Sequence, residues 1–147
     1  MISLYLDTSS KYLYMGLLKD DKLIEEIQED LEGNMSTYTL SKLSKLLEEQ
    51  SLKVKDIDKI YVVNGPGSFT GIRIGITIAK TIAWALNKEI VTITSLEAMA
   101  SSVKEVYDYY IPIIDARRDF VYAGIYNKNK ELVLKEQYIS FNALKVI

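Results

Sequence analysis

The chain has 147 residues, of which 48% are apolar, a net charge of −2 at neutral pH, and neither cysteine nor histidine. The missing residue types exclude disulfide bonds, Ser-His-Asp and Cys-His catalysis, and the zinc sites that enzymes usually build from His or Cys, so we expect no metal site. The acidic balance, the absence of an uninterrupted apolar run that could span a bilayer, and an N-terminus without the basic region of a signal peptide predict a cytoplasmic protein. We expect it to have no membrane partner and no tight direct contact with nucleic acid.

Apolar patterning predicts alternating strands and helices along the first 103 residues. We expect strands at residues 2–7, 12–18, 23–29, 57–63 and 89–93, and helices at 36–50, 71–86 and 94–103. Short turns join the first three strands into an antiparallel meander, and the later strands alternate with crossover helices. The expected fold class is therefore α/β, with a mixed sheet in the order β-β-β-α-β-α-β-α.

The three expected helices differ in their apolar faces. The first carries leucines at spacings of three and four, and either Ser36 or Thr37 can cap its start. The second is apolar nearly all round, which is typical of a helix buried by a sheet and often by a partner as well. The third begins at a capping box formed by Thr94 and Glu97. The one less apolar stripe of the second helix consists of Arg73, Thr77, Lys80, Thr81 and Trp84.

A second copy of the opening hairpin follows residue 111. Residues 5–18 (YLDTSSKYLYMGLL) and 113–126 (IIDARRDFVYAGIY) share an Asp at the end of a strand and a Gly at the same offset in the next strand. A further strand at 131–140 and a helix start at 141–147 continue the pattern. Chance similarity of two hairpins is the alternative. Duplication predicts a first lobe at 1–104 and an incomplete second lobe at 105–147, as in a fragment or a shortened family member.

Residues 64–75 (NGPGSFTGIRIG) hold four of the seven glycines between an expected strand and helix. The Lys and hydroxyl of a Walker loop are missing after Gly71, and the spacing of a dinucleotide fingerprint does not fit. Unpaired amides at a helix start nevertheless attract anions. One hypothesis is a phosphate loop; the alternative is a structural turn in which Ser68 or Thr70 caps the helix and Gly75 permits close packing. The loop candidates for phosphate are Gly65, Gly67, Ser68, Thr70, Gly71 and Arg73.

Two hairpin turns carry further polar residues. Asp7, Thr8 and Ser9 lie at the end of the first strand, where they can assist phosphate or metal binding or simply form a turn. The second hairpin carries the charges Asp115, Arg117, Arg118 and Asp119. These form either a solvated turn or a polar patch that faces a cleft or a partner.

Three motifs together resemble the TsaB (YeaZ) family: GPGSFTGIRIG at 65–75, LDTSS at 6–10 and IDARRDFVYAGIY at 114–126. The first motif is the specific one, and the other two follow in the order of the family. Members of the family are usually longer, with a complete second lobe. The resemblance implies the actin-like ATPase (ribonuclease H-like) fold, with two related lobes.

The resemblance also implies a function. TsaB works with its paralogue TsaD and the ATPase TsaE to add the threonylcarbamoyl group to the adenosine next to the anticodon of tRNAs that read codons starting with A. TsaD carries the metal-binding histidines and the transfer chemistry, so TsaB is expected to be a non-catalytic scaffold with no catalytic residue and no required cofactor. Weak binding of ATP or ADP at the glycine loop is compatible with this role.

In the family, the first two helices form the interface with TsaD or with a second copy. On this sequence they correspond to residues 36–50 and 70–86, and a packed interface should bury on the order of 1,600 Å². The candidates for buried packing around this interface are Leu40, Leu43, Leu47, Ile72, Ile76 and Ala79. Periodicity alone does not tell which of them face the partner and which face the sheet.

Two other functions remain as alternatives. One is an ATP-dependent kinase or hydrolase of the actin-like class, with Asp7 as the base and the glycine loop on phosphate. The other is a glycoprotease-type peptidase, which the lack of His and Cys disfavours.

Overall fold

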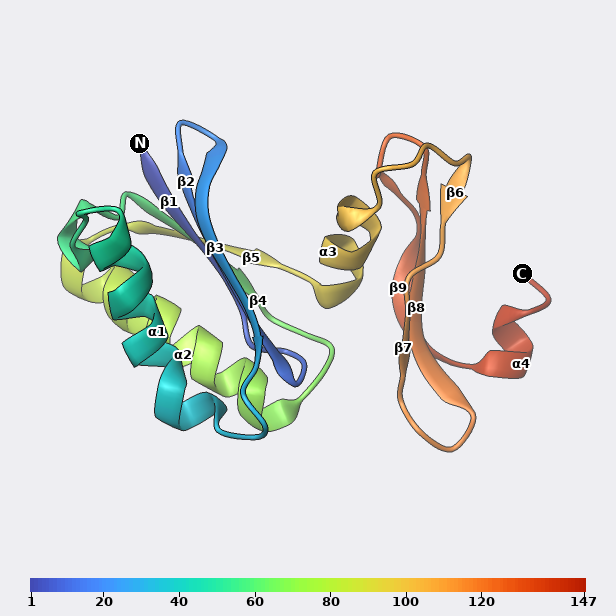
Figure 1. The fold of residues 1–147 in the computed structure, drawn as a ribbon. Coiled ribbons are helices and arrows are strands. Elements are labelled where there is room, and N and C mark those ends of the chain that lie inside the picture. Colours follow the sequence, from blue (N-terminus) through green and yellow to red (C-terminus); the bar gives the residue numbers. More distant parts are fainter. The chain divides into compact units, whose positions relative to one another are not determined.

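The computed structural model describes all 147 residues, which divide into two compact units, Met1–Ile93 and Thr94–Ile147 (Figure 1). The first unit contains β1 (Ile2–Asp7), β2 (Tyr12–Lys19), β3 (Lys22–Asp30), α1 (Met35–Glu49), the 3-10 turn η1 (Val54–Asp56), β4 (Lys59–Val63), α2 (Phe69–Leu86) and β5 (Glu89–Ile93). The second contains α3 (Ser95–Ser102), β6 (Tyr109–Tyr110), β7 (Ile113–Asp115), β8 (Phe120–Asn127), β9 (Leu132–Ser140) and α4 (Phe141–Leu144).

The sheet of the first unit has the strand order β3-β2-β1-β4-β5. The first three strands form an antiparallel meander, β4 pairs parallel with β1, and β5 pairs parallel with β4. A parallel neighbour requires a crossover, and α1 and α2 supply the two crossovers. The mixed sheet and the actin-like, ribonuclease H-like plan expected from the sequence are therefore confirmed.

One face of this sheet, covered by α1 and α2, forms the hydrophobic core (Figure 1). Alternate residues of each strand point to that face, as the two-residue period of a strand requires. By length and composition alone α2 could span a membrane, since it has 18 residues with a mean hydropathy of 1.2. The sequence pattern did not single out this segment, because polar and charged residues interrupt its apolar ones. Its inner side packs against β1, β4 and β5, which accounts for much of that apolar composition. The buried residues of α2 are Gly71, Gly75, Ala79, Ile82 and Ala83.

The start of α1 differs from the sequence prediction. The helix begins at Met35, and no side chain caps it, so neither Ser36 nor Thr37 has the expected role. The residue at the cap position, Asn34, instead donates from its side-chain amide back to the carbonyl of Leu31 at 3.2 Å.

The other two main helices have side-chain caps. α2 begins at Phe69, two residues earlier than expected, because Ser68 Oγ accepts from the Gly71 amide at 3.1 Å. The Thr94 hydroxyl caps α3, as expected, by accepting from the Glu97 amide at 3.0 Å. The strands begin and end within two residues of the expected positions.

The second unit is a sheet of antiparallel strands with β8 at its centre. β9 pairs with one edge of β8, and β6 and β7 pair in turn with the other. The short helix α4 confirms the helix start expected after the third strand.

The two compact units of the structure divide after Ile93 and not after residue 104, because α3 belongs to the second unit. Ala100 of α3 is buried in one cluster with Tyr110 and Tyr126. The ammonium of Lys130 donates to the carbonyls of Ala100 and Val103, at 2.7 and 3.2 Å, at the end of the helix. These contacts attach α3 to β6 and β8, and the boundary therefore lies between residues 93 and 94.

The two hairpins that suggested a repeat share a local hydrogen bond. Asp7 Oδ1 accepts from the Ser9 amide at 2.8 Å, and Asp115 Oδ1 accepts from the Arg117 amide at 2.8 Å. Both are bonds from an Asp side chain to the amide two residues on, the pattern of an Asx turn. This common turn supports the interpretation that the second unit repeats the start of the first.

Candidate functional site

The glycine loop between β4 and α2 packs directly on the turn between β1 and β2. A Cβ added at Gly67 would overlap the carbonyl of Ser9, and one added at Gly71 would overlap the carbonyl of Thr8. The Ser68 amide donates to the Ser9 carbonyl at 2.7 Å. The space beside these two glycines is thus filled by protein backbone.

Thr8 joins the turn to the helix. Thr8 is 1% exposed, and its hydroxyl donates to the Gly71 carbonyl at 2.5 Å. The same hydroxyl oxygen of Thr8 accepts from the Gly75 amide at 3.1 Å. A carbonyl and the amide four residues later are the normal bonding pair of an α-helix. The Thr8 hydroxyl is therefore hydrogen-bonded to both members of one such pair in α2, and it fixes the first turns of the helix to the sheet.

The remaining phosphate candidates occupy different environments. Gly65 is buried with φ at +102°, a conformation that glycine adopts readily. Thr70 and Arg73 are exposed on the first two turns of α2, and the Arg73 guanidinium lies 5.2 Å from the ring centre of Phe69. The half-buried carboxylate of Asp7 is engaged in its turn bond. The structure brings the Thr8–Ser9 turn together with the loop, while nucleotide binding there stays a prediction.

The charged residues of the second hairpin lie on a tight exposed turn. Arg117, Arg118 and Asp119 all have positive φ, at 66°, 53° and 63°, and all three side chains are exposed. Arg118 and Asp119, together with Asp115 and Phe141, border a shallow hollow on the second unit. This geometry fits a solvated turn, and contact with a partner at this place stays a prediction.

The predicted interface residues divide into buried and accessible ones. Leu43, Leu47 and Ala79 are at most 2% exposed and point into the unit's own core, so they lie on the side of the helices that faces the sheet. A contact of the other candidates with a partner stays a prediction. Leu40 is 60% exposed on α1. Ile72 and Ile76 are half-buried on α2.

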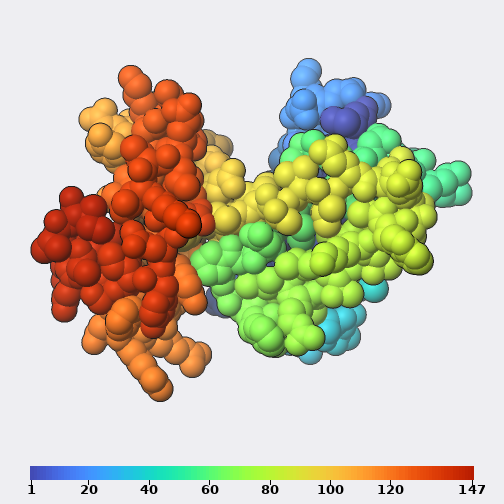
Figure 2. Space-filling model, turned by 180° about the vertical axis from the view of Figure 1, so that it is seen from behind, coloured from blue at the N-terminus to red at the C-terminus, as the bar shows by residue number.

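The exposed side of α2 is the stripe that the sequence marked as less apolar. Trp84 is 87% exposed, and Phe69 at the start of the helix is 74% exposed. Arg73, Thr77 and Lys80 lie between them and are exposed too. In the space-filling view, the yellow-green atoms of residues 69–86 form part of the surface of the first unit (Figure 2). This surface, made by Leu40 of α1 and by the outer stripe of α2, is called the helix surface below.

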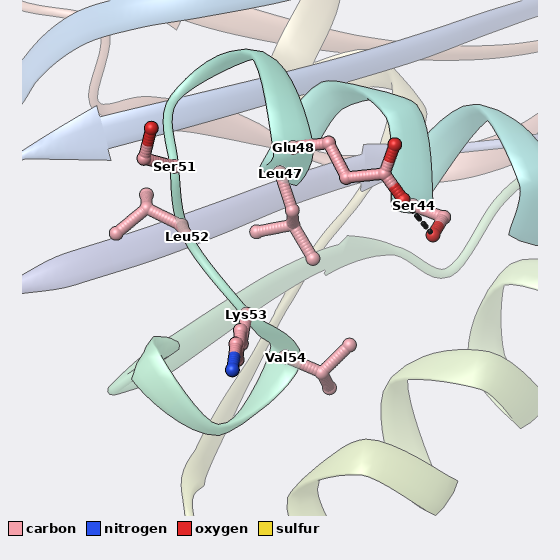
Figure 3. A pocket seen from close by; sticks show the side chains of 7 residues that line it. All are labelled: Ser44, Leu47, Glu48, Ser51, Leu52, Lys53 and Val54. Carbon is pink, nitrogen blue, oxygen red and sulfur yellow. Dashed lines mark hydrogen bonds between the residues drawn. The ribbon is translucent and has the colours of Figure 1, made fainter.

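A pocket opens at the C-terminal end of α1, where the chain turns toward β4 (Figure 3). Leu47 and Leu52 contribute apolar groups, and Val54 is 40% exposed at its rim. The Glu48 carboxylate accepts from the Ser44 hydroxyl at 3.2 Å. The lining consists of Ser44, Leu47, Glu48, Ser51, Leu52, Lys53 and Val54.

The second unit contains a polar cluster of Glu136, Thr94 and Tyr126 that the sequence did not predict. Glu136 Oε1 accepts from the hydroxyls of Thr94, at 2.5 Å, and of Tyr126. Burial, and then the bond to Glu136, raises the pKa of the Tyr126 hydroxyl. In the sequence Glu136 lies between Lys135 and Gln137 in the polar middle of a strand, and nothing there identifies its partners.

Comparison with known proteins agrees with this architecture. The chain is 39% identical to the "tRNA threonylcarbamoyladenosine biosynthesis protein TsaB" of Bacillus subtilis over 133 residues, which cover 90% of this chain and 58% of that protein. It is 31% identical to the protein of the same name from Haemophilus influenzae over 122 residues, which cover 81% of this chain and 51% of that protein. The solved structure of YeaZ from Pseudomonas aeruginosa matches with a TM-score of 0.81 at 27% identity, over 95% of this chain and 66% of that one.

The chain thus spans between about half and two thirds of the length of these relatives. A family model described as TsaD, tRNA N6-adenosine threonylcarbamoyltransferase, matches residues 34–146, which include α1, the glycine loop, α2 and nearly all of the second unit. With this match over most of its length, and with TsaB and YeaZ proteins among its relatives, the chain belongs to the TsaD family.

Proposed function

We propose that this protein is a TsaB-type scaffold that binds a TsaD paralogue in the biosynthesis of tRNA threonylcarbamoyladenosine. The observation that carries the proposal is the similarity to TsaB of Bacillus subtilis across 90% of the chain. The chain has no histidine or cysteine, and no group of three or more acidic, His or Cys side chains is placed to hold a metal ion. In the proposal, the paralogue supplies the transfer chemistry, and this chain supplies a binding surface in the cytoplasm.

The helix surface is the proposed contact with the paralogue. Exposed Leu40, Phe69 and Trp84 lie on the two helices that cover the core, and half-buried isoleucines flank the stripe of α2. Large exposed apolar side chains on helices are typical of protein interfaces. Because the glycine loop and Thr8 fix α2 to the sheet, the surface is held in one orientation before any partner arrives.

The glycine loop supports this reading more than it supports catalysis. Its close contacts are with the Thr8–Ser9 backbone, and the Asp7 carboxylate is occupied by its turn bond. We propose that the loop is chiefly a structural turn that starts an interface helix and adds at most weak ATP or ADP binding. The ATPase TsaE joins the complex in this proposal through the assembled pair.

The test is sedimentation of the chain mixed with its cognate TsaD paralogue, with and without ATP. Leu40→Glu should weaken the mixed species at least about tenfold, because it places a charge in an apolar contact. Leu40 is 60% exposed, so the fold should persist, which circular dichroism checks.

Tyr38→Glu is the matched control. Tyr38 is also exposed and lies two residues away on the same helix. Since successive helix positions are 100° apart, it faces a different side from Leu40. A mixed species that tolerates Leu40→Glu, or the absence of any mixed species at micromolar concentrations, would contradict the scaffold proposal.

A further inference from the structure

Three aromatic rings lie side by side on one face of the sheet of the second unit. Tyr122 of β8 is directly opposite Tyr138 of β9, and Phe120, two residues before Tyr122, points to the same face. The rings of Phe120 and Tyr138 are stacked, with their centres 4.7 Å apart and an angle of 11° between their planes. The Tyr122 ring lies tilted against Tyr138, with 5.5 Å between the centres. These three rings are called the aromatic face below.

The aromatic face is open to solvent. Tyr138 is 55% exposed and Tyr122 is 36% exposed, while Phe120 is half-buried beneath the stack. A further flat ring can extend such a stack, and every nucleic acid base has a flat π face. Aromatic side chains that stand exposed on a sheet and stack with bases are typical of proteins that bind single-stranded RNA.

Two unpaired arginines lie at the end of the sheet where the aromatic face begins. β8 starts at Phe120, directly after the turn that carries Arg117 and Arg118, and both of these side chains are exposed. Neither guanidinium forms an ion pair. The Phe141 amide donates to the Asp119 carbonyl at 2.8 Å, so the end of β9 lies beside this turn (Figure 1). Guanidinium groups bind phosphate and also stack on flat rings.

The charge of the second unit permits contact with a polyanion. Residues 94–147 carry seven basic and seven acidic side chains, so the net charge of −2 lies in residues 1–93. Two carboxylates near the aromatic face are already engaged, because Asp115 accepts from the Arg117 amide and Glu136 accepts from two hydroxyls. The balance of charge in this unit favours weak binding of RNA, since tight binding needs a strongly basic surface.

We propose that the aromatic face binds unpaired bases of an RNA loop, with Arg117 and Arg118 on the neighbouring phosphates. Bases in a duplex are stacked on one another and do not offer their faces, so the ligand is a single-stranded loop. The inference rests on the proposed function for its choice of RNA, because the relatives are named for the modification of a tRNA. It adds a contact with the substrate to a chain that otherwise only binds a paralogue.

Fluorescence anisotropy of a dye-labelled RNA measures this contact on the full chain without the paralogue. One probe is a hairpin with an open loop of unpaired nucleotides, and the comparison probe is the same stem as a blunt duplex. The open loop should bind at least about fivefold more tightly, the lower end of what one base stacked on an aromatic ring contributes. Equal affinity for the two probes would show a purely electrostatic contact and would overturn the proposal.

Tyr138→Leu tests the stack. It should weaken binding of the open loop at least about fivefold. Tyr138 is 55% exposed, so the fold should persist, which circular dichroism checks. The matched control is Tyr109→Leu, which changes a tyrosine of β6 that is 62% exposed and lies outside the aromatic face. If the two variants bind the open loop with the same affinity, the aromatic face is not the binding site.

Arg117→Gln and Arg118→Gln test the phosphate contacts. Each should reduce the slope of log affinity against log salt concentration by about 0.7, the contribution of one phosphate of a single strand. Lys128→Gln is the control, because Lys128 is exposed on the turn at the other end of β8. A reduction as large in Lys128→Gln as in the arginine variants would contradict a site at the turn of the arginines.

Sedimentation with the TsaD paralogue separates this inference from the proposed function. Tyr138→Leu should leave the mixed species unchanged, because Tyr138 is not part of the helix surface. If Tyr138→Leu instead disrupts the mixed species and leaves the affinity for RNA unchanged, the aromatic face binds the protein and the RNA proposal is overturned. A normal mixed species without any binding of RNA also overturns it, and the scaffold proposal then stands. Binding of the open loop without any mixed species has the opposite meaning.

Discussion

The hydroxyl of Thr8 lies within the hydrogen-bond ladder of α2, between the Gly71 carbonyl and the Gly75 amide. Thr8→Val keeps the shape of the side chain and removes both bonds in a site that is 1% exposed. We expect it to lower the free energy of unfolding by about 1–3 kcal/mol, since buried polar groups lose their partner. Urea unfolding followed by circular dichroism measures this loss.

The control for Thr8 is Thr8→Ser, which keeps the hydroxyl and removes only a methyl group. It should retain more of the stability than Thr8→Val does. Equal losses in the two variants would mean that packing of the methyl group, and not the bridge to α2, carries the contribution of Thr8.

The carboxylate of Asp58 makes the free energy of unfolding depend on pH. Its carboxylate accepts from the Ile2 amide at 2.8 Å and from Lys88 at 3.4 Å, and the amide bond is the main cause that lowers its pKa. Since the pKa is lower in the folded state, the stabilisation is complete above the ordinary aspartate pKa of about 4 and is lost as the pH falls below it. In Asp58→Asn, the free energy of unfolding should fall less steeply as the pH is lowered below about 4.

The measurement for Asp58 is the urea midpoint between about pH 6 and pH 3. Asp108→Asn, at an exposed position of the second unit, is the control. An acid limb that is equally steep in Asp58→Asn and in the unsubstituted chain would show that other carboxylates cause it.

At the scale of elements, α3 is attached to β9 through Glu136. Its carboxylate accepts from Thr94, which also caps α3, and from Tyr126 of β8. Glu136→Leu leaves both hydroxyls without this acceptor, and we expect a loss of about 1–3 kcal/mol in the stability of the second unit. Hydrogen exchange of the α3 amides, compared with those of α2, locates the effect.

Gln137→Leu provides the comparison for Glu136. Gln137 is the next residue of β9 and is exposed, so its side chain points to the other face of the strand. We expect Gln137→Leu to change the hydrogen exchange of the α3 amides very little. If Gln137→Leu loosens α3 as much as Glu136→Leu does, the effect comes from β9 as a whole and not from the carboxylate.

The strands and helices themselves were largely predictable, because apolar residues recur every second residue in a half-buried strand and every three to four residues in a helix. The mixed sheet, Ser68 as an alternative cap and the cap at Thr94 all follow from local patterns. The orientation of α2 does not, because a helix that is apolar nearly all round has no periodic mark for the side that meets the sheet. Ala79, fully buried, and Ile76, half-buried, therefore looked alike in the sequence.

The same limit applies to the candidate site. The glycine spacing predicted close approach of a backbone, but it could not say whether the approaching group was a ligand or the Thr8–Ser9 turn. That partner lies about 60 residues earlier in the chain, and only the pairing of β1 with β4 brings the two together. The exposure of Trp84 likewise depends on how α2 is rotated on the sheet.

At the scale of the whole molecule, the boundary at residue 93 separates the helix surface from α3. Residues 1–93 contain the complete five-stranded sheet and both covering helices, so this fragment should fold and unfold cooperatively. Residues 1–104 add α3 without the strands that hold it through Ala100 and Lys130. We expect the two fragments to have the same urea midpoint, with residues 94–104 of the longer one open to proteases. A clearly higher midpoint for residues 1–104 would show that α3 also stabilises the first unit and would restore the boundary expected from the sequence.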